Sequence, residues 1–308
     1  MSRVRPARRA LRLTVVALAG LLLSACATEH GAPAPEPACA TPGGWLDPAT
    51  RLAVGEEDVL GRASATGVVL LGEVHDDPEH HAWQLRVASA LHARGRPLVI
   101  GVEMLPRSAQ PALDRWVAGA SSEAEFLQAV RWTETWGHDP ELYLPLFRFA
   151  RDRRIPMLAL NVDRGLIAKV GRVGWQAVPV AEREGVGDPA PPAEAYRRSL
   201  AEVFADHGGP PGGGDPGRLE RFVQAQTTWD RAMAEAIAAG SAARPTAVIA
   251  GIVGRGHIEH GWGIPHQLEG LGAAKPMVLL AMRADEACAA APGVADAIFV
   301  LPPAPDGA

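Results

Sequence analysis

The sequence predicts an α/β fold, with a mostly parallel sheet flanked by helices and an inserted helical subdomain. Short runs of Val, Ile and Leu alternate with segments whose apolar residues recur at helical spacing, which is typical of βαβ units. The runs are continuous rather than interrupted by polar residues, which indicates strands that are buried on both faces. Two of the runs lead into similar tetrads, Gly72-Glu73-Val74-His75 and Gly254-Arg255-Gly256-His257.

Residues 46–165 are expected to form the first part of the α/β domain. Their apolar runs predict strands at 66–71, 97–102 and 155–160. Asp77 and Pro78 are the residue types that favour the N-cap and the first position of a helix, and Asp139 and Pro140 repeat this pattern. A helix is therefore predicted after each pair. Further helical patterns cover 107–117 and 123–130.

The pattern changes over residues 166–239, where helical spacing continues and no strand is predicted. Its last helix, at about 218–239, places Phe222, Trp229 and Met233 near one another. We interpret this segment as a helical subdomain inserted between strands of the sheet. Strands then resume, so that residues 240–301 complete the α/β domain; they are predicted at 246–253, 277–282 and 298–301.

The N-terminal segment has the features of a bacterial lipoprotein signal peptide over residues 1–25. Five arginines precede a short apolar stretch, and Leu23-Ser24-Ala25-Cys26 resembles a lipobox. Cys26 would then carry lipid and anchor the chain to a membrane, although an ordinary cleaved signal is the alternative. Residues 26–45 are expected to be a flexible tether, and 302–308 a disordered tail. The chain would be an exported lipoprotein of the cell envelope, on the outer membrane in a Gram-negative host.

The net charge and the cysteine content of the chain restrict the functions that it could have. The whole chain has a net charge of −5, and removal of the five signal-peptide arginines makes it −10. This acidic balance argues against nucleic acid as a partner. Cys39 and Cys288 would remain in an oxidising compartment, where a disulfide between them is an open question. The sequence contains no CxxC zinc pattern.

Polar residues with catalytic potential are expected at the ends of the strands. Glu73 and His75 follow the first strand, Glu103 follows the second, and His257 follows the strand at 246–253. Ligands of open α/β sheets bind at the carboxyl ends of the strands, so these side chains are expected to share one edge. Imidazoles and carboxylates there could hold a divalent metal or act as acid and base groups. Structural capping is the alternative for each residue.

Tyr143 is a further candidate, because it lies near Trp136 and His138 in the sequence. A tyrosinate ligates iron in some haem proteins, so a phenol beside imidazoles could do so here. Packing of the ring against the core is the alternative, and position alone favours it. The chain has no G-x-S-x-G, HExxH or CxxCH string, so serine-hydrolase, zincin and covalent c-type haem interpretations have no support.

Taken together, several strings resemble the ChaN family of haem-binding bacterial lipoproteins, within the Tiki-like superfamily. They run in family order: LLGEVHDDPEHH (70–81), VIGVEMLPR (99–107), WGHDPELYLPL (136–146), PMLALNVDR (156–164), TTWDRAMAEAI (227–237) and IAGIVGRGHIEHGWGIP (249–265). The resemblance implies a parallel α/β domain with a helical subdomain, lipid anchoring, haem binding and a role in iron acquisition. It also implies a homodimer that holds haem between protomers, with a tyrosine as the iron ligand.

Tyr143 is the position that fits this tyrosine, and the resemblance outweighs the packing alternative for it. The expected haem contacts among nearby imidazoles are His75, His138 and His257. The wider superfamily is similar to Tiki-type metalloproteases and erythromycin esterases. On that similarity the chain would instead be a metal-dependent hydrolase that uses Glu73, His75, Glu103 and His257. A third hypothesis is a tethered envelope protein that binds a partner through its helical subdomain.

Overall fold

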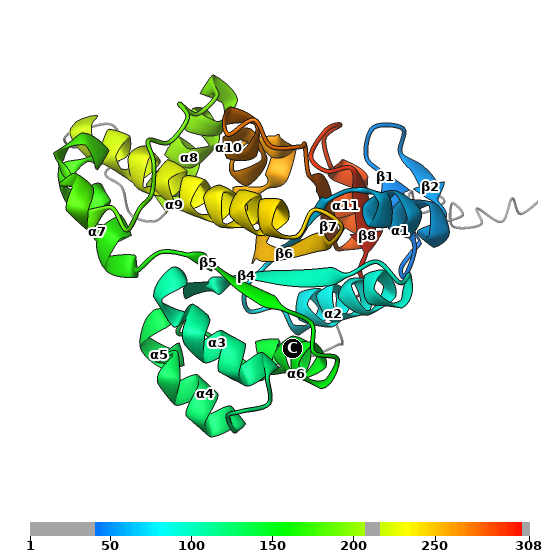
Figure 1. Cartoon of the computed structure of the whole chain (residues 1–308). Coiled ribbons are helices and arrows are strands. Elements are labelled where there is room, and N and C mark those ends of the chain that lie inside the picture. The colour runs from blue at the N-terminus through cyan, green and yellow to red at the C-terminus, as the bar shows by residue number, and fades with distance from the viewer. Residues whose placement is uncertain (1–40, 207–215, 304–308) are drawn as a thin grey trace, which may run out of the picture. The chain divides into compact units, whose positions relative to one another are not determined.

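The computed structural model describes residues 41–206 and 216–303 (Figure 1). Within them, eight strands form one sheet in the order β2-β1-β8-β7-β3-β6-β4-β5. The pairs among β3 to β8 are parallel, whereas β1 pairs antiparallel with β2 and β8. The predicted α/β fold with a mostly parallel sheet is therefore confirmed. The strands are β1 (Trp45–Asp47), β2 (Leu52–Val54), β3 (Val68–Glu73), β4 (Leu98–Pro106), β5 (Met157–Asn161), β6 (Val248–Gly254), β7 (Met277–Met282) and β8 (Ala297–Val300).

The helices alternate with the strands, as the sequence pattern predicts. Asp77 accepts a hydrogen bond from the backbone N–H of Glu79, and Asp139 accepts one from Glu141, each over 2.9 Å with proline at the first helical position. Both predicted helix starts are confirmed. The α-helices are α1 (Glu56–Ala65), α2 (Pro78–Ala93), α3 (Gln110–Val117), α4 (Glu123–Ala129), α5 (Trp132–Thr135), α6 (Pro140–Asp152), α7 (Arg164–Val173), α8 (Glu194–Asp206), α9 (Pro216–Ala243), α10 (Ile264–Gly270) and α11 (Ala284–Ala289).

Helices cover both faces of the sheet. On one face Val69 and Leu71 of β3 pack into a core shared with α1 to α6, and on the other Val68 and Leu70 pack with α9 and α10. Successive residues of a strand point to opposite faces, so a strand covered on both sides must be apolar throughout. Figure 1 shows α2 and α6 on one side of the sheet and α9 and α10 on the other. This two-sided burial explains the continuous apolar runs.

The strand boundaries differ from the predicted ones where polar residues are buried. β3 extends to Glu73, and β4 continues through Glu103 to Pro106 with an irregularity in its pairing to β5. Polar side chains end a predicted strand, but here buried partners allow the strand to continue. Trp45, expected in the tether, begins β1 beside β8. Cys26 and Cys39 lie outside the described residues, so lipidation and the disulfide stay predictions.

The segment predicted as an inserted helical subdomain contains α7, α8 and α9. Both α7 and α8 contact α9, and α9 in turn packs on β5 and β6. The helix α9 thus joins this segment to the sheet, while the domain boundaries at 166 and 239 stay predictions. None of the helices over the described ranges is long and apolar enough to cross a membrane.

Replacement of Gly240 by Ala tests how closely α9 packs on the sheet. An alanine usually stabilises a helix interior relative to glycine by about 1 kcal/mol. At Gly240, however, a Cβ would lie 2.4 Å from Leu158 Cδ1 and 3.1 Å from Ile249 Cδ1. We therefore expect Gly240→Ala to lower the free energy of unfolding in urea by about 1–3 kcal/mol.

The matched control is Gly171→Ala in α7, where a Cβ would meet no atom within 4 Å. This variant is expected to be as stable as the parent or slightly more stable. Equal stabilisation by both substitutions would show that α9 packs less closely on β5 and β6 than described here.

Candidate functional site

Acidic and imidazole side chains meet at the carboxyl ends of three adjacent strands. Glu73 is the last residue of β3 and lies beside Gly254, the last residue of β6, in the parallel register. Glu103 belongs to β4, which is the neighbour of β6 on its other side. His257 follows β6 directly in a short 3-10 turn. The structure therefore brings Glu73, Glu103 and His257 to one edge, as expected for parallel strands.

The Glu73 carboxylate is the centre of the first polar network. Glu73 is 2 % exposed, and its Oε1 lies 2.9 Å from His75 Nδ1 and 3.1 Å from the Tyr143 hydroxyl. Its Oε2 lies 3.2 Å from His81 Nδ1. Burial of this carboxylate raises its pKa, but the hydrogen bonds from His75 and His81 outweigh that effect and lower the pKa to about 2. Glu73 is therefore an ion held by two imidazoles.

The second network is centred on His257. Its Nδ1 lies 2.7 Å from Oδ1 of Asp230 in α9, and its Nε2 lies 3.5 Å from Oε1 of Glu103. The Tyr196 hydroxyl of α8 donates to the other Asp230 oxygen over 2.9 Å. Burial lowers the pKa of His257, but the charges of Glu103 and Asp230 outweigh it and raise the pKa to about 9. His257 is therefore a buried imidazolium at neutral pH.

Close backbone packing joins the two networks. The backbone N–H of Gly254 donates to Glu103 Oε2 over 2.6 Å. A Cβ at Gly254 would lie 2.9 Å from His75 Cε1 and 3.6 Å from Glu103 Oε2. Any side chain there would displace the His75 ring, so the glycine of the second tetrad is required for close approach. Burial lowers the pKa of His75, while its hydrogen bond to Glu73 and the charge of Glu103 raise it, with a raised pKa as the net result.

Aromatic side chains form the outer rim around His75. Trp136 meets the His75 ring edge-on with 4.8 Å between ring centroids, and the His138 ring lies 5.3 Å away. The His75 side chain is 33 % exposed, whereas Glu73 behind it is closed off from solvent. Arg164 donates to the Trp136 carbonyl over 2.8 Å and so ties this rim to the start of α7. His75, Trp136 and His138 thus form the mouth of the site, in which the two imidazoles are partly exposed and the indole is buried at 8 % exposure.

Tyr143 lies behind this mouth and not within it. Its side chain is 1 % exposed, and its hydroxyl lies 3.1 Å from both Glu73 Oε1 and the His75 carbonyl oxygen. Burial and the Glu73 charge raise the pKa of this phenol far above its usual value. The hydroxyl is a neutral donor that holds Glu73 in place. Its role as an iron ligand stays a prediction, and this geometry gives it no support.

The structure also identifies residues that the sequence analysis did not propose. Asp230 and Tyr196 are buried in the predicted helical segment, where a fully buried acid has no local sequence signal. His81 contacts Glu73 although it lies in the first turn of α2, which a solvated helix cap also explains at sequence level. Asn161 bonds through its Nδ2 to the Glu103 carbonyl over 3.1 Å, which makes it a link between strand ends.

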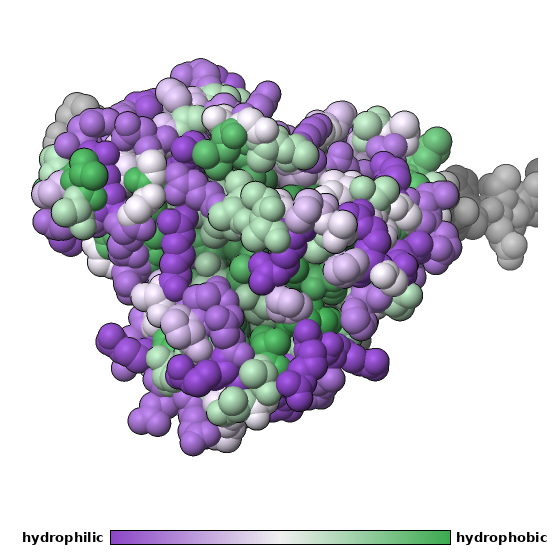
Figure 2. Space-filling model, viewed as in Figure 1, coloured by the Kyte–Doolittle hydropathy of each residue, from purple (hydrophilic) through white to green (hydrophobic). Residues whose placement is uncertain are grey.

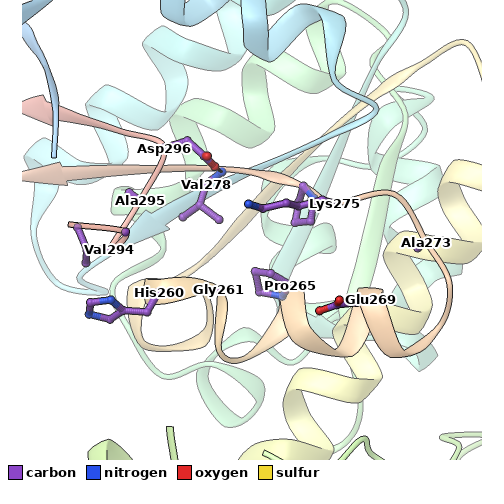
Figure 3. A pocket seen from close by; sticks show the side chains of 12 residues that line it. His260, Gly261, Pro265, Glu269, Ala273, Lys275, Val278, Val294, Ala295 and Asp296 are labelled. Atoms are coloured by element: carbon purple, nitrogen blue, oxygen red, sulfur yellow. Dashed lines mark hydrogen bonds between the residues drawn. The ribbon is translucent and has the colours of Figure 1, made fainter. Parts of the chain in front are cut away.

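The segment after His257 borders a separate cavity. His260 and Pro265 face Lys275 and Asp296 across a space of about 440 Å³ (Figure 3). None of Glu73, His75, Glu103 and His257 lines it. His260 therefore belongs to this cavity.

Metal binding has little support in this geometry. Across residues 41–206 and 216–303, no three His, Cys, Asp or Glu side chains are arranged so that they could hold a metal ion. Glu73 Oε1 accepts from His75 and Tyr143, and both His257 nitrogens face carboxylates, so these atoms already have partners within the protein. The networks are instead suited to hold and move protons, because each imidazole is oriented by a carboxylate.

The raised pKa of His257 leads to a pH dependence of stability. A pKa of about 9 in the folded chain, against about 6.5 in the unfolded chain, corresponds to roughly 3 kcal/mol. This contribution is fully present below pH 6.5 and is lost as the pH rises through about 9. The double variant His257→Gln/Asp230→Asn removes both charges of the pair. We expect its free energy of unfolding in urea to fall less than that of the parent between pH 6.5 and 9. Equal falls would contradict the assigned charge state.

A search of solved structures found several chains similar to this one. The structure of ChaN of Campylobacter jejuni with cofacial haem is 19 % identical, with a TM-score of 0.67 over 83 % of this chain and 95 % of that one. An erythromycin esterase in its open conformation is 12 % identical, with a TM-score of 0.45 over 77 % of this chain and 76 % of that one. A toxin effector domain from Vibrio vulnificus is 19 % identical, with a TM-score of 0.44 over 75 % and 36 %.

A search of curated proteins found no match to the chain. A family description, in contrast, matches residues 59–268, which include both tetrads and all residues of the two networks. That description is the haem-binding uptake family ChaN of the Tiki superfamily. On this match, which covers more than half of the sequence, the chain belongs to the ChaN family.

Proposed function

We propose that this chain is a lipid-anchored, haem-binding protein of the cell envelope that serves haem or iron uptake. Membership of the ChaN family supports haem binding, and the related protein of Campylobacter jejuni binds haem cofacially. The observation that carries the proposal is the mouth formed by His75, Trp136 and His138. The two partly exposed imidazoles provide ligand atoms for iron, and the buried Trp136 indole packs against them.

Among the available donors, imidazoles fit haem iron better than the phenol does. Glu73 occupies His75 Nδ1, which leaves Nε2 without a hydrogen-bond partner in the described residues. A carboxylate behind an imidazole fixes the orientation of the ring and increases its basicity, as in metal sites generally. The lowered pKa of His138, caused by partial burial and by His75, keeps that imidazole neutral and able to bind a metal. Haem, when bound, would supply the iron centre and its redox chemistry.

Haemin titration of the full chain distinguishes the two kinds of ligand. We expect haemin to give a Soret band that Tyr143→Phe retains and that His75→Ala and His138→Ala shift, with binding weakened at least tenfold. The reason is that the two imidazoles reach solvent, whereas the phenol is 1 % exposed. Absorption spectra and circular dichroism on the same samples separate lost binding from lost folding.

Two other outcomes of the haemin titration would contradict parts of this proposal. Loss of the band in Tyr143→Phe alone would restore the tyrosine as the ligand and contradict the imidazole assignment. An unchanged haemin spectrum with the parent chain would contradict haem binding itself.

Anchoring and dimerisation complete the proposal. Lipid at Cys26 would hold the domain at the membrane, and mass spectrometry of the membrane-extracted chain tests for it. A homodimer that holds haem between protomers would place two mouths face to face, and sedimentation with and without haemin tests for it. Both features rest on the sequence strings and on the family relationship.

Hydrolysis is a second candidate function, and the paired carboxylate–imidazole groups favour it. Glu73 orients His75, and Asp230 orients His257, with Glu103 beside both imidazoles. His75 could take a proton from water through Nε2. Both His257 nitrogens already face Asp230 and Glu103, so His257 would act by positioning the Glu103 carboxylate. Because the described side chains offer no three-ligand metal set, this candidate uses acid–base roles and not a bound metal.

Ester hydrolysis is the measurement for this candidate. With a panel of p-nitrophenyl esters, we expect His75→Ala and His257→Gln each to reduce kcat/KM at least 100-fold. His266→Ala is the matched control, because His266 bonds to the Pro191 carbonyl and touches neither network. No hydrolysis by the parent chain would exclude these esters as substrates, and equal rates in all variants would show that neither imidazole takes part in the reaction.

A further inference from the structure

A second cavity lies at the opposite edge of the sheet from the candidate site. Its lining comes from the amino end of β4 and from the segments that join α2, α6 and α9 to β4, β5 and β6, and it has a volume of about 590 Å³. Leu98, Val99, Ile155 and Ala247 are the buried apolar residues among them. In Figure 2 the surface is hollowed below the end of α9, with hydrophobic residues inside the hollow and hydrophilic residues around it.

The charged residues of this cavity are all basic. Four arginines line it, and no aspartate or glutamate does. These arginines are Arg96, Arg153, Arg154 and Arg244. In the described part of the chain, none of the four forms an ion pair with a carboxylate. A concentration of four positive charges is unusual for a chain whose net charge is −5.

The partial negative charges at the ends of the neighbouring helices balance only part of the positive charge of these arginines. Arg96 donates to the Thr246 carbonyl over 3.1 Å, and Arg154 donates to the Ala118 carbonyl over 3.1 Å, so both satisfy backbone groups. Each of the three helices that end here contributes only about half a negative charge. Arg153 and Arg244 are exposed and donate no side-chain hydrogen bond to any described residue. The guanidinium groups of Arg153 and Arg244 are therefore available to bind a ligand.

We propose that this cavity binds a phosphate group, carried either by a soluble compound or by a membrane lipid. Guanidinium groups present paired N–H donors that match the oxygens of phosphate, and their charge is retained at any physiological pH. Donors from three separate segments surround the cavity, which suits a tetrahedral anion better than a planar carboxylate. The apolar floor of the cavity strengthens the attraction, because charges interact more strongly beside a medium of low dielectric constant.

Titration calorimetry with the full chain and sodium pyrophosphate at 150 mM NaCl tests for a soluble ligand. The key variant is Arg153→Gln/Arg244→Gln, because these exposed side chains have no partner whose loss would disturb folding. The matched control is Arg172→Gln, an exposed arginine near the end of α7 and outside the cavity. We expect the double variant to weaken pyrophosphate binding at least tenfold and the control to change it less than twofold.

Vesicle sedimentation tests for a lipid source of the phosphate. The full chain with Cys26→Ser, which cannot be acylated, is compared on phosphatidylglycerol and phosphatidylcholine vesicles, with and without the Arg153→Gln/Arg244→Gln pair. Pyrophosphate binding that the pair abolishes identifies a soluble phosphate compound. Retention on phosphatidylglycerol that the pair abolishes identifies a lipid headgroup. Either result supports the proposal. It is overturned if neither probe binds, or if Arg172→Gln reduces binding as much as the double variant does.

Discussion

The arrangement of the candidate site depends on one interaction, the ion pair between the buried Glu73 carboxylate and its imidazoles. An ionised carboxylate cannot remain in a protein interior without compensating partners. Glu73 at the end of β3 has His75 and His81 as such partners and the Tyr143 hydroxyl as an additional donor. These four side chains come from β3, the turn after it, α2 and α6. Compensation of a single charge therefore fixes how two helices meet the sheet.

A second buried carboxylate, on the other side of the sheet edge, also needs compensating partners. Asp230 is fully buried on α9 and is compensated by His257 and by the Tyr196 hydroxyl. Glu103 then takes the remaining His257 nitrogen and a backbone N–H. Tyrosine, carboxylate and imidazole thus occur twice in the same order. In each network the tyrosine hydroxyl donates to the carboxylate, and the imidazole is the group nearest the edge of the sheet. Tyr143 and Tyr196 therefore have corresponding positions.

Sequence reasoning succeeds where a residue type has a local cause and fails where its partner is distant. The strand cores, the caps at Asp77 and Asp139 and the shared edge of Glu73 and His257 follow from apolar runs, helix-start chemistry and parallel topology. The role of Tyr143 does not, because its hydroxyl partner lies 70 residues away. Asp230 could not be identified from the sequence because its partners lie in α8 and in the turn after β6, which are not its sequence neighbours. Strands β1 and β2 have only three residues each, too few to show a period.

The mouth of the site and its buried interior have different roles in haem binding and in acid–base chemistry. Haem binding needs only the partly exposed imidazoles at the rim, and it gives no reason to bury Glu73, Glu103 and Asp230. Burying three carboxylates carries a large desolvation cost, which hydrophobic residues of similar volume would avoid. In return, the buried carboxylates hold His75 and His257 in fixed orientations. Such fixed orientation improves a metal ligand and a proton carrier equally well. His75 belongs to both the mouth and the interior, so a haem bound there would occupy the same imidazole that hydrolysis requires. The two functions would therefore compete for His75.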